Sequence, residues 1–267
     1  MTGDSRNSLF EMNSISNNVR KALIDLTGYF IYRKRSLPVG VDLQEDLVHK
    51  FAIDPKIVFD VGANVGQTAL SYAELFEGAT IYSFEPFISA FRLLEKNTAH
   101  LPNVQSFQVA LGNCDQSIEV KIHDETHSDL NSLKPVNENR SAVACSERVK
   151  VLTLDSFCAE EGIEEIDLLK IDTEGYELEV LRGAEKFLKT GRVGAILCEI
   201  AMAKKNQRNT QLPEVQDFLE PLGYYFVGLY ETNVNYFSQG IAYSNALFVV
   251  PREAIDYFAA ERRNDRT

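Results

Sequence analysis

The chain has 267 residues, of which 45% are hydrophobic, which is enough for one large domain with a core, with or without an appendage. Its formal net charge of −12 and sequence pI near 4.9 argue against nucleic acid as a partner, because phosphate binding needs a basic surface. The four cysteines (Cys114, Cys145, Cys158 and Cys198) form no C-x-x-C pair, so we expect reduced thiols rather than a disulfide framework or a zinc site.

The N-terminal segment is predicted to form an amphipathic helix, because apolar residues recur at helical spacing from Ile15 to Phe30 and a basic run follows at 33–35. We expect it to pack on the main domain, with its basic end complementing the helix dipole. Peripheral contact with a membrane or an acidic glycolipid is the alternative. No apolar run is long enough to span a bilayer, and the first residues lack the apolar core of a secretory signal, which favours a cytoplasmic protein. The predicted organisation is an extension over 1–50, a main domain over 51–254 and a tail over 255–267.

A glycine turn between a buried strand and a helix is the most informative local feature. Residues 57–61 have the apolar character of a strand covered on both faces, and they run into Gly62-Ala63-Asn64-Val65-Gly66. Gly62 and Gly66 would let the backbone turn tightly and approach a ligand. The next predicted strand, 80–84, ends at Glu85, 19 residues beyond Gly66, where a carboxylate can accept hydrogen bonds from ribose hydroxyls. This layout predicts a nucleoside site.

The spacing of the turn argues against a dinucleotide. A dinucleotide fingerprint reads G-x-G-x-x-G, whereas Asn64 stands here at the position of the second glycine. Asp60 at the predicted strand tip would also repel a pyrophosphate, and it suits a cationic ligand such as the sulfonium of S-adenosylmethionine. An NAD-dependent oxidoreductase, and a β–turn–α unit without a ligand, stay as alternatives.

The remainder of the chain alternates predicted strands and helices, which is typical of an α/β fold with a mainly parallel sheet. Residues 123–146 are polar without a clear period, and loops of this length are usually functional or disordered. In chain order we expect a helix at 87–99, a strand at 104–111, an edge strand at 117–122, a strand at 149–154 with a short helix through 157, a strand at 167–172, a helix from 180 to a cap at 191, a strand at 195–200, a helix at 213–222, and an antiparallel pair at 224–229 and 246–250.

Acidic residues stand at four predicted strand ends: Asp60, Glu85, Asp172 and Glu199. Each alone can be explained as a helix cap, but four at one pole indicate a binding site, since ligands bind beyond the carboxyl ends of parallel strands. Asp172, Glu174 and Glu199 are candidates to activate an acceptor hydroxyl by taking its proton. Alternatively, a carboxylate pair could hold Mg²⁺ and lower the hydroxyl pKa; we assign no metal ligand from the sequence.

Histidines supply a second set of base candidates. His123 and His127 lie four residues apart in the polar loop, and one of them could reach an acceptor as general base. The alternatives are incidental histidines in a surface loop, or a metal pair that would need a helix this loop does not clearly supply. His49 and His100 lie among helix-end signals, and we expect no catalytic role for them.

These features come together in a resemblance to a known family. Over roughly residues 55–250 the chain resembles the FkbM family of S-adenosylmethionine-dependent methyltransferases. The resemblance implies a class I methyltransferase (Rossmann-like) fold, with a mainly parallel sheet, an antiparallel terminal hairpin and, here, an N-terminal helical extension. The motifs that carry it are Asp-Val-Gly-Ala-Asn-Val-Gly (60–66), Phe-Glu-Pro (84–86), Ala-Leu-Gly (110–112), Asn-Ser-Leu (131–133), Thr-Leu-Asp-Ser-Phe (153–157), Leu-Leu-Lys-Ile-Asp-Thr-Glu-Gly-Tyr-Glu (168–177) and Val-Leu-Arg-Gly-Ala (180–184), followed by Glu199.

The resemblance also implies the cofactor and its contacts. S-adenosylmethionine would lie between the glycine turn, the ends of the next two strands and the polar loop. The residues assigned on this ground are Asp60, Gly62, Asn64 and Gly66 for the methionine and ribose, Glu85 for the ribose, Pro86 as a further cofactor contact, Ala110 and Leu111 for the adenine, and Asn131 and Ser132 for the loop over the active site. His123 and His127 lie in the same loop and are kept as substrate-loop candidates.

In function, the resemblance implies O-methylation of a hydroxyl on a sugar, a glycolipid or a polyketide-type natural product. It does not identify this small-molecule or glycan acceptor, which the extension and the polar loop would select. Tyr176, Tyr230 and Tyr236 are candidates to stack on a sugar, with core packing as the alternative. A noncatalytic nucleoside-binding domain on the same scaffold is a further alternative.

Overall fold

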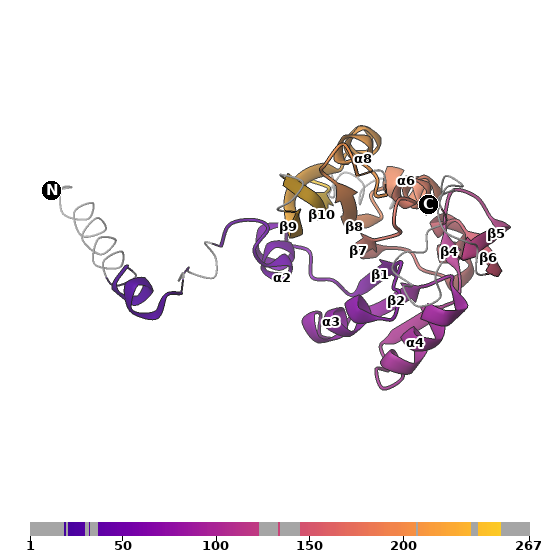
Figure 1. Cartoon of the computed structure of the whole chain (residues 1–267), viewed down its shortest axis with the longest axis horizontal. Coiled ribbons are helices and arrows are strands. Elements are labelled where there is room, and N and C mark those ends of the chain that lie inside the picture. The colour runs from indigo at the N-terminus through magenta and orange to yellow at the C-terminus, as the bar shows by residue number, and fades with distance from the viewer. Residues whose placement is uncertain are drawn as a thin grey trace, which may run out of the picture. The chain divides into compact units, whose positions relative to one another are not determined.

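The computed structural model (Figure 1) describes residues 19, 21–29, 32, 37–122, 133, 145–206, 208–235 and 240–251. The chain divides into two compact units, Met1–Pro38 and Val39–Thr267, which we describe separately. Residues 39–50, placed with the extension from the sequence, lie in the second unit, and 255–267 lie outside the described part. None of the described helices has the length and apolar character needed to cross a bilayer.

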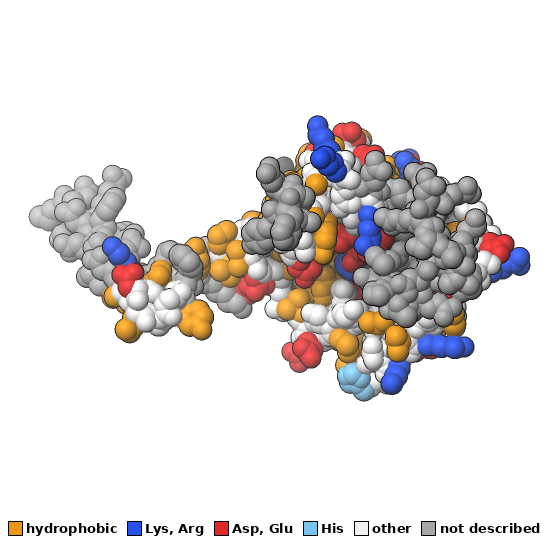
Figure 2. Space-filling view, in the orientation of Figure 1, with side chains coloured by type: hydrophobic (Ala, Val, Ile, Leu, Met, Phe, Trp, Pro, Cys, Tyr) orange, Lys and Arg blue, Asp and Glu red, His pale blue; other side chains and the backbone are white. Residues whose placement is uncertain are grey.

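The first unit contains the predicted helix. Residues 21–27 are helical, and the helix ends at Gly28, whose amide donates to the Ile24 carbonyl and whose φ is +72°. Leu23 and Leu26 are exposed, and apolar side chains are visible on this segment in Figure 2. The helix therefore has an apolar face within this unit that is open to solvent.

The second unit is built on a seven-stranded sheet with the order β3-β2-β1-β7-β8-β10-β9. β1 pairs in parallel with β2 and β7, β2 with β3, and β7 with β8, whereas β10 runs antiparallel to both β8 and β9. This is the expected class I methyltransferase fold, a mainly parallel sheet with a terminal antiparallel hairpin. The strands are β1 Ile57–Val61, β2 Thr80–Phe84, β3 Val104–Phe107, β7 Ile166–Ile171, β8 Val193–Ala201, β9 Tyr225–Asn235 and β10 Gly240–Val249.

Helices cover both faces of the sheet, which explains why its central strands are apolar on both sides. Figure 1 shows α3 and α4 on one side and α6 and α8 on the other. In β1, Val58 packs in the cluster on the α3 side, and Phe59 and Val61 pack in the cluster on the α6 side. The helices are α2 Leu43–Glu45, the π-helical turn η2 Asp46–Lys50, α3 Gln67–Leu75, α4 Ile88–Thr98, α5 Leu154–Glu161, α6 Glu177–Gly183, α7 Glu185–Lys189, α8 Leu212–Leu219 and the 3₁₀ turn η4 Glu220–Leu222.

The strand predicted at 104–111 is two strands in different sheets. After β3, the amide of Val109 donates to the Phe107 carbonyl in a tight turn. The following β4 (Ala110–Leu111) pairs in parallel with β6 (Cys145–Leu152), which also pairs antiparallel with β5 (Gln116–Ile122) in a separate three-stranded sheet. The apolar run hides the turn because Val109 and β4 are buried as fully as a continuous strand would be.

The helix predicted from 180 to 191 is also interrupted. Ala184, between α6 and α7, has φ −102° and ψ 12° and leaves helical geometry. The carboxylate of Asp155 accepts from the amides of Lys186 and Phe187 at 3.0 and 3.2 Å, and so caps α7. A cap supplied from another helix leaves no trace in the local periodicity.

Candidate active site

A cavity of about 260 Å³ lies at the carboxyl ends of β1, β2, β7 and β8. Parallel strands bring these ends to one pole of the sheet, which is where ligands bind in such folds. We divide the lining into a β1–β2 half and a β7–β8 half. The β1–β2 half comprises Val61, Gly62, Ala63, Asn64, Gln67, Thr68, Phe84, Glu85, Pro86, Phe87, Val109, Ala110, Leu111 and Leu133, and the β7–β8 half comprises Lys170, Asp172, Thr173, Glu174 and Glu199.

The glycine turn after β1 is held by backbone bonds and by close packing. The amides of Gly62 and Ala63 donate to the Phe84 carbonyl at 3.0 and 2.9 Å. Gly62 has a φ of +85°, and a Cβ there would lie 1.8 Å from the carbonyl oxygen of Asp172. The position needs glycine because of this positive φ, as the predicted tight turn implies, and because the ends of β1 and β7 touch. Gly62 also lines the cavity, so the expected approach of a ligand stays a prediction.

Glu85, directly after β2, is held by backbone amides. Its Oε2 accepts from the amide of Asn64 at 3.0 Å, and its Oε1 accepts from the amide of Phe87 at 2.9 Å. Burial raises the pKa of Glu85 to about 7, against the lowering effect of these two amides. A carboxylate has about four acceptor positions, so each oxygen keeps capacity for a ligand hydroxyl.

A buried lysine connects β1 to the β7–β8 half. Lys170 is 5% exposed; its Nζ donates to Oδ2 of Asp172 at 3.1 Å and lies 3.5 Å from Oδ1 of Asp60. Asp60 is fully buried opposite Lys170 in the sheet register. Burial lowers the pKa of Lys170, but the charges of Asp172 and Asp60 outweigh that effect and the net shift is upward. Lys170 is therefore a cation at neutral pH.

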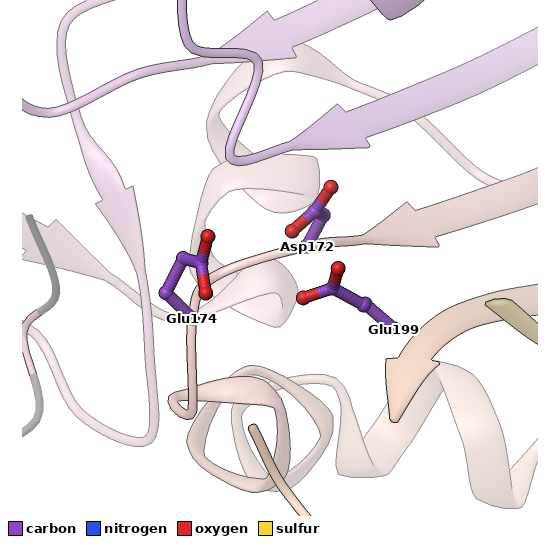
Figure 3. A group of neighbouring side chains, drawn as sticks. All are labelled: Asp172, Glu174 and Glu199. Atoms are coloured by element: carbon purple, nitrogen blue, oxygen red, sulfur yellow. The ribbon is translucent and has the colours of Figure 1, made fainter. Parts of the chain in front are cut away.

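Three carboxyl groups converge in the β7–β8 half. Figure 3 shows Asp172 just beyond the end of β7, Glu174 on the turn that follows, and Glu199 on the neighbouring β8, and oxygens of all three lie within 4.8 Å of one another. Burial, assisted by the charges of Asp172 and Glu174, raises the pKa of Glu199 to about 9. Burial also raises the pKa of Glu174 to about 7, although Arg208 lowers it. Glu199 therefore holds a proton at neutral pH and lies beside Asp172, whose Oδ2 accepts from Lys170.

The turn at 172–177 is fixed by one buried side chain, Glu177. Its Oε1 accepts from the amides of Thr173 and Gly175 at 3.2 and 2.8 Å. Its Oε2 accepts from the amide and the hydroxyl of Thr210 at 3.2 and 2.5 Å. The Glu177 carboxylate thus joins the turn after β7 to the loop after β8, in addition to the contacts that Glu174 makes with that loop.

The structure brings most of the predicted site residues to this cavity. Asp60 does not line it, because the side chain lies behind Lys170; Gly66 does not line it either, and packs against Leu94 and Thr98 of α4. Tyr230 donates to Asp46 at 2.6 Å in the core. The predicted residues on the lining are Gly62, Asn64, Glu85, Pro86, Ala110, Leu111, Asp172, Glu174 and Glu199, whereas His123, His127, Asn131, Ser132 and Tyr236 lie outside the described residues.

Sequence reasoning missed three side chains that donate to the carboxyl cluster. Besides Lys170, Arg208 donates to Glu174 at 2.5 Å, and Asn209 donates to Glu199. The signal for Lys170 was available, since a lysine inside an otherwise apolar strand is rarely buried without a partner. Arg208 and Asn209 lie in a loop whose position depends on tertiary contacts, and nothing local marks them.

The same cluster has the composition of a cation site, so Mg²⁺ has to be tested against its surroundings. A hard cation needs ionised oxygen ligands. Here Lys170, Arg208 and Asn209 already donate to the three carboxyl groups, and Glu199 holds a proton at neutral pH. The residues do not fit the cation, and we assign no metal to them.

The strand order, and the carboxylate that follows β2, define a class I methyltransferase fold. Residues 60–226 match the family described as the methyltransferase FkbM domain, and the chain belongs to this family.

Known relatives agree with that assignment. "Methyltransferase 1" of Beauveria bassiana is 27% identical over 148 residues, which cover 49% of this chain and 59% of the relative. "2-O-methyltransferase NoeI" of Sinorhizobium fredii is 29% identical over 151 residues, with coverages of 52% and 61%. The matches thus span about three fifths of the length of these relatives. A solved structure, Aeropyrum pernix fibrillarin with bound S-adenosyl-L-methionine, aligns at 15% identity and a TM-score of 0.43 over 72% of this chain and 66% of that one, which is too distant to support a statement about function.

Proposed function

We propose that this chain is an S-adenosylmethionine-dependent O-methyltransferase whose acceptor is a hydroxyl of a sugar, a glycolipid or a related natural product. One observation carries the proposal: a single cavity joins a half suited to a nucleoside with a half suited to accepting a proton. The relative named as a 2-O-methyltransferase supports oxygen as the acceptor atom.

The β1–β2 half fits S-adenosylmethionine. Glu85 has acceptor capacity for ribose hydroxyls, and Phe87, Val109 and Leu111 offer apolar surface for the adenine ring. When bound, the cofactor supplies a methyl group on a positively charged sulfur. Asp60, which we expected to contact the methionine part, is buried behind Lys170 and acts through that lysine.

The β7–β8 half fits a neutral hydroxyl acceptor. Asp172 is the candidate base, which would take the hydroxyl proton as the oxygen becomes a nucleophile. Glu199 carries a proton at neutral pH and can donate to a second oxygen of the acceptor. A polyol can both donate to Asp172 and accept from Glu199, whereas an anionic acceptor would meet like charge. This favours a saccharide over a phosphorylated or carboxylated acceptor.

The competing functions predict different ligands. An NAD-dependent oxidoreductase has no support from the turn, where Asn64 replaces the middle glycine of a dinucleotide fingerprint. A noncatalytic domain would bind the nucleoside without turnover. Thermal shift separates these cases first: we expect stabilisation by S-adenosylhomocysteine and none by NAD. Stabilisation by NAD alone would overturn the proposal.

The decisive experiment is transfer of a radiolabelled methyl group from S-adenosylmethionine to panels of saccharides, glycolipids and polyketide-type alcohols, with and without EDTA. We expect alkali-stable label in a saccharide-containing acceptor and no effect of EDTA, because the cluster is already supplied with donors. Binding of S-adenosylhomocysteine without transfer to any panel would favour the noncatalytic domain. Loss of transfer in EDTA, with recovery on adding Mg²⁺, would return a metal to the cluster.

A further inference from the structure

Burying the charged side chain of Lys170 within the sheet costs desolvation free energy. Lys170 lies on β7 between Leu169 and Ile171, which are fully buried, and it is itself 5% exposed. A buried ion pair often stabilises a fold less than apolar residues of similar volume would, because both charges lose their hydration. Packing of the sheet therefore does not explain a lysine at this position.

Its partner Asp60 is poorly satisfied. The carboxylate is fully buried, and neither oxygen receives a well-formed hydrogen bond from the described residues. Lys170 approaches it at 3.5 Å, whereas the bond from Lys170 to Asp172 is shorter, at 3.1 Å. The Lys170 ammonium thus donates its hydrogen bond to Asp172, which lines the cavity, while the charge of Asp60 on the other side balances its positive charge.

The surroundings decide what the ammonium can do. Three titratable groups influence the pKa of Lys170: Asp60 on β1, Tyr72 on α3 and Asp172 after β7. Around the carboxyl cluster, the nearby charges are those of Glu174 on the turn, Glu177 on α6 and Glu199 on β8. These acids keep the proton on Lys170, so it can donate a hydrogen bond but cannot serve as the base.

We propose that Lys170 is a positioning residue for methyl transfer: held from behind by Asp60, it fixes Oδ2 of Asp172 so that Oδ1 faces the acceptor hydroxyl. This inference rests on the proposed function. A lone pair of the hydroxyl oxygen would form the new bond to the methyl carbon, and the electron pair of the broken C–S bond would leave with the sulfur. The hydroxyl proton would pass to Asp172, and the electron pair of the O–H bond would stay on the oxygen. Lys170 keeps its own protons throughout. Fixing the base before the reaction removes a reorientation from the barrier.

The test has to separate positioning from charge balance. Lys170→Met alone would leave Asp60 charged and unpaired, and a folding defect would obscure the result. The double variant Asp60→Asn with Lys170→Met removes both buried charges at similar volume. Glu185→Gln with Lys189→Met is the matched control, because it makes equivalent changes in an exposed pair on α7 with a 2.6 Å contact.

For the D60N/K170M variant we expect a wild-type melting temperature and S-adenosylhomocysteine affinity, with kcat lower by about 100-fold and the acceptor KM unchanged. The acidic limb of its kcat–pH profile should shift to higher pH, because the variant has lost the ammonium that stabilises the ionised carboxylates of the cluster. A crystal structure of the variant should show the Asp172 carboxylate turned away from its present position. The E185Q/K189M control should match the wild type in every measurement.

Two outcomes would count against the inference. Wild-type kcat and an unchanged pH profile in D60N/K170M would show that Lys170 only balances Asp60. An unmoved Asp172 in the crystal structure would overturn positioning even if turnover fell. Failure of the wild-type protein to methylate any acceptor would instead remove the proposed function, and the crystal structure would still decide whether Lys170 orients Asp172.

Discussion

The two halves of the cavity are built by different means. In the β1–β2 half, backbone amides of Asn64 and Phe87 hold Glu85, so the only side chain that the arrangement needs is the carboxylate itself. In the β7–β8 half, side chains hold side chains: Lys170 with Asp172, Arg208 with Glu174, and Asn209 with Glu199. Backbone donors survive most substitutions, whereas side-chain donors can be lost singly. We therefore expect the first half to tolerate substitution of neighbouring side chains better than the second.

The largest effect should come from Asp172→Asn, which removes the proposed base and leaves the β1–β2 half intact. We expect kcat to fall by about 10²- to 10⁴-fold, with the affinity for S-adenosylhomocysteine unchanged. Steady-state kinetics and calorimetry measure the two quantities. Glu185→Gln, on the exposed surface of α7, is the control. Equal losses in turnover and affinity would mean that Asp172 supports the fold and that the two halves are not separable.

Gly62→Ala should affect both halves of the cavity, because Gly62 belongs to the β1–β2 half and contacts the end of β7. A Cβ would lie 1.8 Å from the Asp172 carbonyl oxygen, at a φ of +85°. We expect a stability loss of at least about 2 kcal/mol, seen as a fall of about 4–8 °C in Tm, with cofactor affinity and turnover both reduced.

A second glycine supplies the control for this substitution. Gly78 has a similar φ of +80° and nothing within 4 Å of the added Cβ, so Gly78→Ala reports the backbone strain without the clash. Equal melting temperatures for the two variants would show that contact between the ends of β1 and β7 is not what requires glycine at position 62.

Glu85→Gln should affect only the β1–β2 half. The affinity for S-adenosylhomocysteine should fall by about tenfold, because hydrogen bonds to a charged acceptor are lost, while kcat at saturating cofactor is retained. In the wild type, the affinity should rise with pH through about 7, the raised pKa of Glu85, because the ionised form is the one that we propose accepts ribose hydroxyls. Calorimetry from pH 6 to 8 should show that rise, and E85Q should lack it. An affinity that still changed with pH in E85Q would contradict this role. So would a loss of affinity in the exposed control Glu74→Gln as large as the loss in E85Q.

The last prediction concerns protein stability in the β7–β8 half rather than turnover or ligand affinity. Glu199 has a raised pKa of about 9 against 4.5 for the free side chain, so the folded state holds a proton that the unfolded chain releases. Stability is therefore lost as pH rises from about 4.5 towards 9. Glu199→Gln removes this pH-dependent contribution to stability. The glutamine amide can still donate to Asp172 and accept from Asn209. The Tm difference between variant and wild type should grow with pH; a constant difference would show that Glu199 is ionised at neutral pH.

The sequence predicted those features that depend on local contacts. The strand at 57–61, the glycine turn and Glu85 belong to one β–α–β unit, where periodicity and spacing determine the geometry. The missed features depend on distant partners. Asp155 caps the second helix after Ala184 from another element, and the turn after β3 is hidden because the residues that follow it, Val109 and β4, are buried and apolar. Arg208 and Asn209 reach the cluster only after β8 and its following loop have been placed.

One carboxylate also sets how this part of the molecule can open. The amides of Thr173, Gly175 and Thr210, on two segments, all donate to the fully buried Glu177. Hydrogen exchange at any of them requires that carboxylate to leave, which exposes the others. The three amides should therefore exchange with one opening free energy, as a single cooperative unit. An acceptor that loosens the turn bearing Asp172 would loosen the loop after β8 in the same event.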